Sequence, residues 1–272
     1  MDSAHEKSAA EQSAKTHDSC KNNIVIETKK LNVFMGKNKV VNNVSIRIPK
    51  NMITVIIGHS GCGKTTLLKS LNRLLDIRPD VRVEGEILVD GQNILEPDTD
   101  VPSIRKKMGL LLQTPTPLPM SIFDNVAYGL RIHGERDKKR TRAKVQRSLS
   151  DVGLWDEVKE RLDSPASMLS IGQQQRLCLA RAIAIKPEVL LCDEPTSSLD
   201  PIAAKRIEEL LINLKKDYTV VLVTHTLRQA KRIADYAIFI YSGEVLEQGK
   251  ADELFNNPQN QKTREYIQGK IG

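Results

Sequence analysis

Aromatic residues make up only 4% of this chain of 272 residues, and cysteine occurs only four times. The cysteines stand at positions 20, 62, 178 and 192, with no CxxC pair and no spacing typical of metal ligands. We therefore expect neither a disulfide framework nor a zinc site. Such cysteine usage is typical of a reduced, cytosolic protein.

Long hydrophobic runs are also missing. The longest uncharged stretch, residues 108–123, is interrupted by Pro115, Pro117 and Pro119, so it is not expected to form a membrane-spanning helix. Residues 1–22 are polar, without the apolar segment of a secretory signal and without apolar periodicity. We expect a mobile tail there.

Positive charge is in excess, with 41 Lys and Arg against 34 Asp and Glu and a net charge of +7. This excess suits a nucleotide, a nucleic acid or a membrane surface and does not distinguish among them. The densest basic cluster spans residues 136–147. Because no aromatic residues interleave there for base stacking, we interpret the cluster as a solvated helix face and expect no nucleic-acid partner.

From residue 24 onward, strand-like and helix-like patterns alternate. Strand patterns occur at residues 24–26, 31–34, 40–48, 53–57, 86–89, 108–112, 189–192, 219–223 and 237–241. Helical patterns occur at residues 67–75, 122–132, 138–152, 174–184, 200–215 and 226–235. The alternation predicts an α/β fold with a largely parallel sheet, and the strand-free middle predicts a helical insertion.

The sharpest motif is a phosphate-binding loop between an apolar strand and a leucine-striped helix. The pattern G-x-x-x-x-G-K-[ST] is filled by Gly58, His59, Ser60, Gly61, Cys62, Gly63, Lys64 and Thr65, with Thr66 next in the chain. Glycines let main-chain amides close around phosphate oxygens, and the helix N-terminus adds its positive end. Lys64 is expected to reach the β- and γ-phosphates of ATP and Thr65 to offer its hydroxyl to Mg²⁺. Cys62 is interpreted as a small residue that fills a tight loop rather than as a reactive thiol.

Two adjacent carboxylates, Asp193 and Glu194, follow the apolar run of residues 189–192. The C-terminal end of a buried parallel strand is where α/β sheets bind ligands. We expect Asp193 to hold the metal, directly or through water, and Glu194 to activate the attacking water. Taken alone, the pair also fits a strand that ends in solvent, but the phosphate loop favours the catalytic interpretation.

Four further elements follow in order. They are Gln113 at a strand end, the segment Leu-Ser-Ile-Gly-Gln-Gln-Gln-Arg at residues 169–176, Ser-Leu-Asp at 198–200, and His225 after another strand. With the loop and the acidic pair, they resemble the ATP-binding subunits of ABC transporters over about residues 24–268. The resemblance implies a P-loop NTPase cassette with a RecA-like, mainly parallel core (residues 23–113 and 187–272), an N-terminal antiparallel β part and a helical subdomain (residues 114–186).

The resemblance also implies a role for each matching residue. Gln113 matches a glutamine that contacts Mg²⁺ and senses the γ-phosphate, and His225 matches a histidine near that phosphate. Ser170 and Gly172 match signature residues that cap the ATP held by the opposite subunit, and Asp200 matches the acid at the seam between subunits. Two copies arranged head to tail around ATP are therefore implied.

Two positions depart from the family pattern. Ile171 stands where a glycine is usual, and a β-branched residue resists positive φ. Either the local backbone accommodates isoleucine or the capping contact is weakened. Met35 stands where an aromatic residue usually stacks on adenine; a methionine can cover the base with less defined geometry.

Three segments, residues 113–125, 173–191 and 266–272, further resemble the ATP-binding proteins of bacterial phosphate importers. This likeness implies ATP hydrolysis that powers phosphate uptake, at the cytoplasmic face of the cell membrane. It also implies two integral membrane permease subunits as partners and an extracytoplasmic phosphate-binding protein as an indirect one. Three alternatives stay open: an importer subunit for another solute such as polar amino acids, a soluble ABC-type ATPase, and a regulatory module that hydrolyses little ATP.

Overall fold

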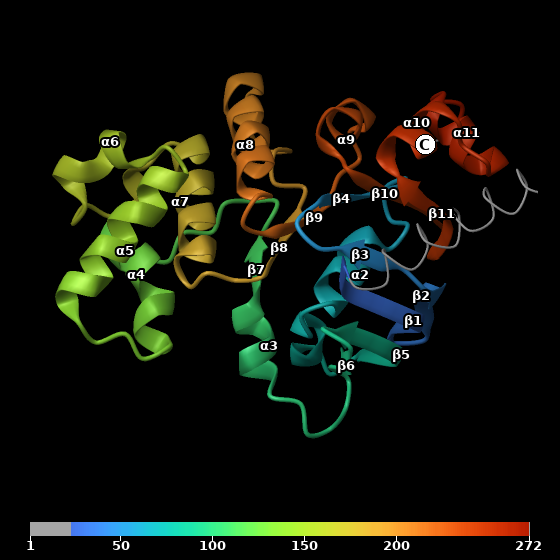
Figure 1. Ribbon diagram of the computed structural model, residues 1–272, viewed down its shortest axis with the longest axis horizontal. Helices are drawn as coiled ribbons and strands as arrows, with labels where there is room; N and C mark the ends of the chain where they lie inside the picture. Colours follow the sequence, from blue (N-terminus) through green and yellow to red (C-terminus); the bar gives the residue numbers. More distant parts are fainter. Residues whose placement is uncertain (1–22, 272) are drawn as a thin grey trace, which may run out of the picture.

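The central sheet of the molecule has six strands. They are β4 (Ile53–Ile57), β7 (Met108–Leu111), β8 (Val189–Asp193), β9 (Thr219–Val223), β10 (Tyr236–Tyr241) and β11 (Glu244–Lys250). Their order across the sheet is β11-β10-β4-β9-β8-β7, and each pair is parallel except β10 with β11. This arrangement is seen in a computed structural model that describes residues 23–271 (Figure 1).

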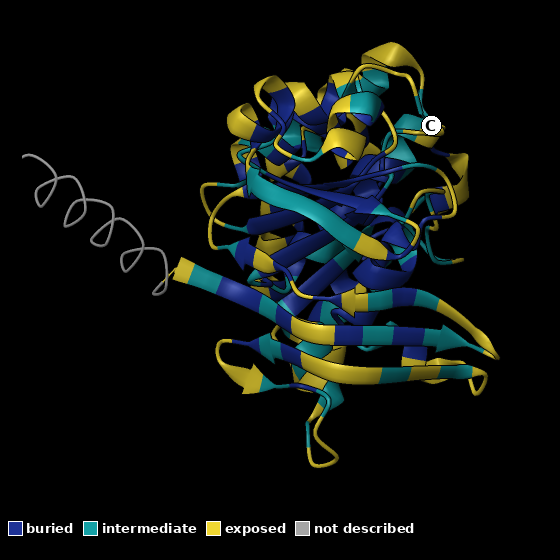
Figure 2. Cartoon of the chain, turned by 90° about the vertical axis from the view of Figure 1, so that its right-hand side faces the viewer, coloured by how far each residue is buried: buried dark blue, intermediate teal, exposed yellow. Residues whose placement is uncertain are grey.

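A second, antiparallel sheet is built from the N-terminal part of the described chain. Its strands are β1 (Ile24–Met35), β2 (Asn38–Val44), β3 (Arg47–Pro49), β5 (Val81–Val89) and β6 (Gln92–Asn93). They pair in the order β2-β1-β5-β6, with β3 also paired to β1. Buried and exposed residues alternate along these strands, as expected for a sheet with one face on the core (Figure 2).

Helices cover the central sheet and form a separate group beside it. They are α2 (Lys64–Ser70), α3 (Val101–Lys107), α4 (Ile122–Ile132), α5 (Lys138–Asp151), α6 (Trp155–Val158), α7 (Ile171–Ala184), α8 (Pro201–Leu214), α9 (Leu227–Ile233), α10 (Ala251–Asn256) and α11 (Gln261–Ile267). The helices α4 to α7 gather on one side, beyond β7 and α8 (Figure 1). This group is the helical insertion predicted from the strand-free middle of the sequence; its limits at residues 114 and 186 stay a prediction.

The core consists of two apolar clusters on the two faces of the central sheet. Successive side chains of a strand point to opposite faces, so Ile53, Val55 and Ile57 join the cluster that includes α4, α5 and α7. Ile56, on the same strand, joins the cluster formed with α2 and the antiparallel sheet. Strand β4 is therefore buried on both faces, and the loop that follows it starts from a fixed point.

The predicted fold class is confirmed, but several predicted element limits are wrong. Helix α2 ends at Ser70, because Arg73 turns with a φ of +58° and Leu74–Ile77 form a separate 3-10 turn. The two strands expected at residues 24–34 are one strand, β1, with an irregular register near Lys30. The expected tail, residues 1–22, lies outside the described residues.

Cys62, Cys178 and Cys192 are free and buried. Between residues 23 and 271, no helix has both the length and the apolar character needed to cross a membrane.

Candidate functional site

The phosphate loop connects β4 to α2, and two of its glycines stand where no other residue fits. A Cβ atom on Gly58 would overlap the main-chain carbonyl oxygen of Ile240. Gly63 has a φ of +101°, and its Cβ would lie 2.8 Å from the carbonyl oxygen of Val40. Because Gly63 also caps the N-terminus of α2, the free amides of the first helical turn open onto the loop.

Lys64 is buried inside this loop, with 5% of its surface exposed. Its Nζ donates hydrogen bonds to the carbonyl oxygens of Gly58, at 2.9 Å, and His59, at 2.8 Å. Both partners are neutral, and no carboxylate of residues 23–271 forms an ion pair with this ammonium. A buried cation without a counter-charge is costly, so the loop is suited to an anionic ligand.

Cys62 fills the loop from within, as predicted for a small residue there. It is 2% exposed, and its Sγ lies beside the position that a Cβ on Gly58 would take. Burial raises the pKa of the Cys62 thiol above its ordinary value, and the charge of Lys64 only partly opposes this. The thiol is therefore protonated and shielded at neutral pH.

The first carboxylate of the acidic pair faces the start of α2. Thr65 Oγ1 donates a hydrogen bond of 2.7 Å to Asp193 Oδ1, and Lys69 Nζ lies 3.5 Å from Asp193 Oδ2. Asp193 is buried at the end of β8. A hydroxyl and a carboxylate side by side next to a phosphate loop are the oxygen ligands that Mg²⁺ prefers, with phosphate oxygens completing its shell.

The second carboxylate points elsewhere because the chain turns sharply at Glu194, whose φ is +46°. Its Oε2 lies 2.8 Å from Nδ1 of His225, and the Glu194 side chain is 17% exposed. The prediction that the two acids diverge is therefore confirmed by their different partners.

Most of the predicted loop residues meet Glu194 and the strand-end residues at one hollow of about 450 Å³, at the C-terminal ends of the strands β4, β8 and β9. The predicted residues Gly58, His59, Cys62 and Asp193 do not line it. It is lined by Val40, Ser60, Gly61, Gly63, Lys64, Thr65, Thr66, Gln113, Glu194 and His225. Val40 was not predicted as a site residue. The sequence indicated only that it belongs to a strand. Met35 lies at the end of β1, opposite Asn38, and does not line the hollow.

The signature residues lie apart from the hollow. Ser170 caps α7, where its Oγ accepts a hydrogen bond of 3.3 Å from the amide of Gln173. Asp200 caps α8. The two helix starts touch, because a Cβ on Gly172 would lie 3.1 Å from the Cβ of Ala203. Ser170, Gly172 and Asp200 are thus close in space but do not line the hollow that holds Lys64.

Ile171 occupies the first turn of α7 without backbone strain. It is the first residue of the helix and is not among the residues with positive φ. Its side chain points outward and is 56% exposed. The local backbone therefore accommodates isoleucine, as in the first alternative considered for this position; a weakened capping contact with an opposite subunit stays a prediction.

The sequence did not predict that Gln175 connects parts of the site. Gln175, fully buried, donates from Nε2 to the carbonyls of Leu112 at 3.1 Å and Pro195 at 2.8 Å. It thereby ties α7 both to the end of the strand that precedes Gln113 and to the segment after Glu194. A glutamine inside a helical pattern gives no sign of such distant partners.

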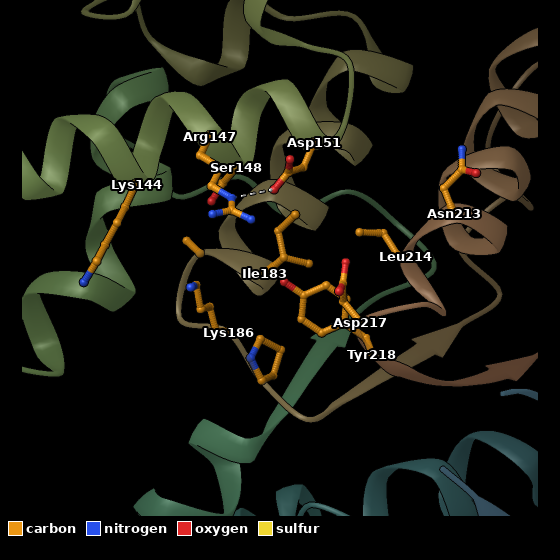
Figure 3. A pocket seen from close by; sticks show the side chains of 12 residues that line it. Lys144, Arg147, Ser148, Asp151, Ile183, Lys186, Asn213, Leu214, Asp217 and Tyr218 are labelled. Atoms are coloured by element: carbon orange, nitrogen blue, oxygen red, sulfur yellow. Dashed lines mark ion pairs between the residues drawn. The ribbon is translucent and has the colours of Figure 1, made fainter. Parts of the chain in front are cut away.

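A second hollow, of about 440 Å³, lies between α5, the end of α7 and the end of α8 (Figure 3). Arg147 and Asp151, both on its wall, form an ion pair of 3.8 Å. Burial, with the carboxylates of Asp151 and Asp217, raises the pKa of the Tyr218 hydroxyl. None of the predicted site residues lines this hollow.

The sequence is similar to known proteins over most of its length. The sequence profile of the ABC transporter family matches residues 41–197. The phosphate import ATP-binding protein PstB of Borreliella afzelii is 50% identical over 258 residues, which are 95% of this chain and 99% of that protein. The protein of the same name from Thermotoga maritima is 53% identical over 248 residues, 91% of this chain and 99% of that protein.

Solved structures share the fold. The structure of cbiO1 from Clostridium perfringens, part of the ABC transporter complex cbiONQ, superposes with a TM-score of 0.75 at 25% identity, over 92% of this chain and 100% of that one. A bacterial Atm1-family ABC exporter with ATP bound superposes with a TM-score of 0.76 at 24% identity, over 92% of this chain and 42% of that one.

Proposed function

The chain belongs to the ABC transporter family, and from this premise we propose that it is the ATP-hydrolysing subunit of an importer of inorganic phosphate. The observation that carries ATP binding is the buried ammonium of Lys64, which forms no ion pair with a carboxylate of the described residues and lines the same hollow as Glu194 and His225. The transported solute follows from the phosphate import relatives that are 50% and 53% identical.

In the proposed reaction, the loop binds the β- and γ-phosphates through its amides and Lys64. Glu194 orients a water molecule for in-line attack on the γ-phosphorus and takes one of its protons, while the bond from this phosphorus to the β–γ bridging oxygen breaks and ADP leaves. His225 holds the Glu194 carboxylate at the rim of the hollow through their 2.8 Å contact. Gln113, which also lines the hollow, is proposed to contact the γ-phosphate.

We propose that Mg²⁺ accompanies the nucleotide. Thr65 and Asp193 fit this ion, because their oxygens already converge at 2.7 Å and because Mg²⁺ sites commonly combine one carboxylate with substrate phosphates. When bound, the ion neutralises charge on the β- and γ-phosphates. Gln113 is the further proposed protein ligand. Within residues 23–271, no group of three or more His, Cys, Asp or Glu side chains forms a self-sufficient metal site, which agrees with an ion that arrives with its phosphates.

We further propose that two copies of the chain sandwich ATP head to tail. Ser170, Gly172 and Asp200 lie at adjacent helix starts, where main-chain amides and the helix dipole favour an anion. They do not face the hollow of their own chain. A second copy would bring them over the bound nucleotide.

The membrane partners of the proposed importer are two integral permease subunits at the cytoplasmic face of the membrane. An extracytoplasmic phosphate-binding protein would deliver the ion without touching this chain. We propose no nucleic-acid partner.

The test is transport in membrane vesicles that contain the assembled importer. ATP-dependent uptake of radiolabelled phosphate is expected with the natural chain and is expected to be lost with Glu194→Gln. ATP-dependent uptake of a polar amino acid instead of phosphate would establish the alternative solute. ATP hydrolysis that needs no membrane partner and drives no uptake would support a soluble ATPase.

A further inference from the structure

The C-terminal helix α11 contacts strand β10, which borders the phosphate loop, although some 200 residues separate α11 from the loop in the chain. Its Tyr266 is 6% exposed and stacks on Phe239 of β10, with ring centroids 4.9 Å apart. Strand β10 is the strand whose Ile240 carbonyl abuts Gly58. Burial raises the pKa of the Tyr266 hydroxyl, and the nearby main-chain N–H of Gly58, in the loop, partly opposes this shift.

Tyr241, two residues after Phe239, provides a second contact between α11 and the phosphate loop. The Nζ of Lys262, on α11, lies 4.5 Å from the centre of the Tyr241 ring. The Tyr241 ring also contacts the imidazole of His59 in an edge-to-face arrangement, with ring centroids 5.0 Å apart. His59 is the second residue of the phosphate loop, and its Nδ1 lies 2.8 Å from the Ser60 carbonyl. Lys262, Tyr241 and His59 therefore form a chain of contacts from the helix to the loop.

Helix α11 is itself held firmly. Asn260 caps it by accepting hydrogen bonds from the amides of Lys262 and Thr263. The carboxylate of Glu247, on β11, accepts hydrogen bonds from the amides of Gln259, at 2.9 Å, and Asn260, at 3.1 Å. A helix fixed at its start in this way can act as a rigid support.

We infer that α11 is a brace for the phosphate loop, and that Tyr266 and Lys262 are positioning residues that set the affinity of the loop for ATP. A glycine-rich loop loses much conformational freedom when its amides close around phosphates. Contacts that fix the loop beforehand reduce this cost and so favour binding. The inference rests on the proposed function, because it concerns the same nucleotide site.

The brace acts on binding and not on the chemical step. Neither Tyr266 nor Lys262 lines the hollow, and neither forms a hydrogen bond or ion pair with Glu194 or His225. The charge of Glu194 is the smallest of the causes that shift the pKa of the Tyr266 hydroxyl. Weakening the brace should therefore raise the KM for ATP and leave kcat at saturating ATP nearly unchanged. A purely structural role would lower the unfolding temperature without this separation of KM from kcat.

The experiment compares steady-state ATP hydrolysis by single variants of the full chain. Tyr266→Phe keeps the ring stack and removes the hydroxyl, and the KM for ATP is expected to rise about three- to tenfold. Lys262→Gln removes the cation over the Tyr241 ring, and a rise of about two- to fivefold is expected. Lys262→Arg restores a cation over the ring and should return the KM to near the value of the natural chain.

Matched controls come from the same chain. Tyr218→Phe removes a half-buried hydroxyl far from the loop, and Lys270→Gln removes an exposed lysine next to α11; both should keep the KM. Unchanged KM values in Tyr266→Phe and Lys262→Gln would overturn the inference, as would an equal rise in Tyr218→Phe. Lys64→Ala separates a failure of this inference from a failure of the proposed function: if Lys64→Ala binds a fluorescent ATP analogue as tightly as the natural chain does, the proposed nucleotide site itself is wrong. The same analogue measures affinity if hydrolysis is too slow to follow.

Discussion

Nδ1 of His225 lies 2.8 Å from Oε2 of Glu194, although 31 residues separate the two in the chain. Glu194 follows β8 directly, and His225 follows the neighbouring strand β9 by two residues. Because parallel neighbours end at the same edge of a sheet, the two side chains meet at the hollow that also holds the phosphate loop. The contact fixes the carboxylate where a water molecule could be activated against a bound γ-phosphate.

Glu194→Gln should separate nucleotide binding from hydrolysis. The amide keeps the size of the side chain but cannot take a proton from water, so turnover is expected to fall by about 10²–10⁴. ATP affinity should stay near that of the natural chain, because the loop is untouched. Steady-state hydrolysis and equilibrium binding of a fluorescent ATP analogue check both parts. Glu209→Gln, on the exposed face of α8, is the control; hydrolysis by Glu194→Gln at the rate of that control would contradict the assignment.

Lys64→Ala should mainly weaken the binding of ATP. The substitution removes charge-assisted hydrogen bonds that contribute about 1.5–3 kcal/mol, which corresponds to about a tenfold to 150-fold loss of ATP affinity. Fold stability should change little, because the partners of Lys64 Nζ among residues 23–271 are neutral groups of the loop, namely two carbonyl oxygens and the Cys62 sulfur. Binding titrations with thermal unfolding as a companion measurement test this. Lys50→Ala, on the surface before β4, should bind as the natural chain does; equal affinity in Lys64→Ala would remove the loop from the nucleotide site.

The sequence predicted those parts of the site that local rules determine. The phosphate loop, the acidic pair and the strand ends depend on neighbours in the chain, and the parallel order of the strands then brings Lys64, Glu194 and His225 together. What could not be predicted depends on distant partners. Asn125, fully buried, accepts a hydrogen bond of 2.7 Å from the amide of Leu118 and so shapes the proline-rich segment after Gln113. A single asparagine in a helical pattern carries no sign of that role.

The ends of helices and strands also depend on distant partners and could not all be predicted. The leucine stripe through Leu74 predicted a continuous helix, but Arg73 adopts a positive φ and its guanidinium bonds Asp76 and the Ile94 carbonyl. Tertiary contacts thus overrode a regular pattern. For the same reason, the sequence did not predict that α11 supports the loop, because this support depends on aromatic side chains of β10.

Glu157 should make the stability of the helical group depend on pH. Hydrogen bonds from Arg176, with a further one from Gln173 and the charges of Arg176 and Arg206, lower the pKa of Glu157 to about 2, against the opposing effect of burial. A lowered pKa in the folded state means that this stabilisation is full above pH 4.5 and is lost as the pH falls towards 2. At pH 7, Glu157→Gln should lower the free energy of unfolding by about 1–3 kcal/mol.

The measurement is urea unfolding of the natural chain and of Glu157→Gln at several pH values. The difference between their free energies of unfolding should become smaller as the pH falls below 4.5. Glu160→Gln, close in sequence but without an ion pair to any residue between 23 and 271, is the control and should differ little from the natural chain at any pH. A difference that stays constant down to acid pH would show that the Glu157 charge is not the source of the stabilisation.

Ile171→Gly should leave ATP hydrolysis equal or faster. The residue opens α7 with an ordinary backbone and an exposed side chain, so the substitution removes bulk from the capping surface and keeps the Ser170 cap. The helix should lose at most about 1 kcal/mol of stability. Hydrolysis rates at saturating ATP, measured well below the unfolding temperature, test this; a clear loss of rate would show that isoleucine contributes to the cap.

Hydrolysis should require two copies of the chain. The signature residues Ser170 and Gly172 do not line the hollow that holds Lys64, so one molecule cannot place both sets of groups on the same nucleotide. By mass action, the activity per molecule should fall steeply when the protein is diluted at saturating ATP, even though each copy still binds ATP. Ser170→Arg, which fills the capping surface, should lose hydrolysis at every concentration and keep ATP binding. Activity per molecule that stays constant until the copies are fully separated would mean that a single chain completes its own site, and the serine would then need a different role.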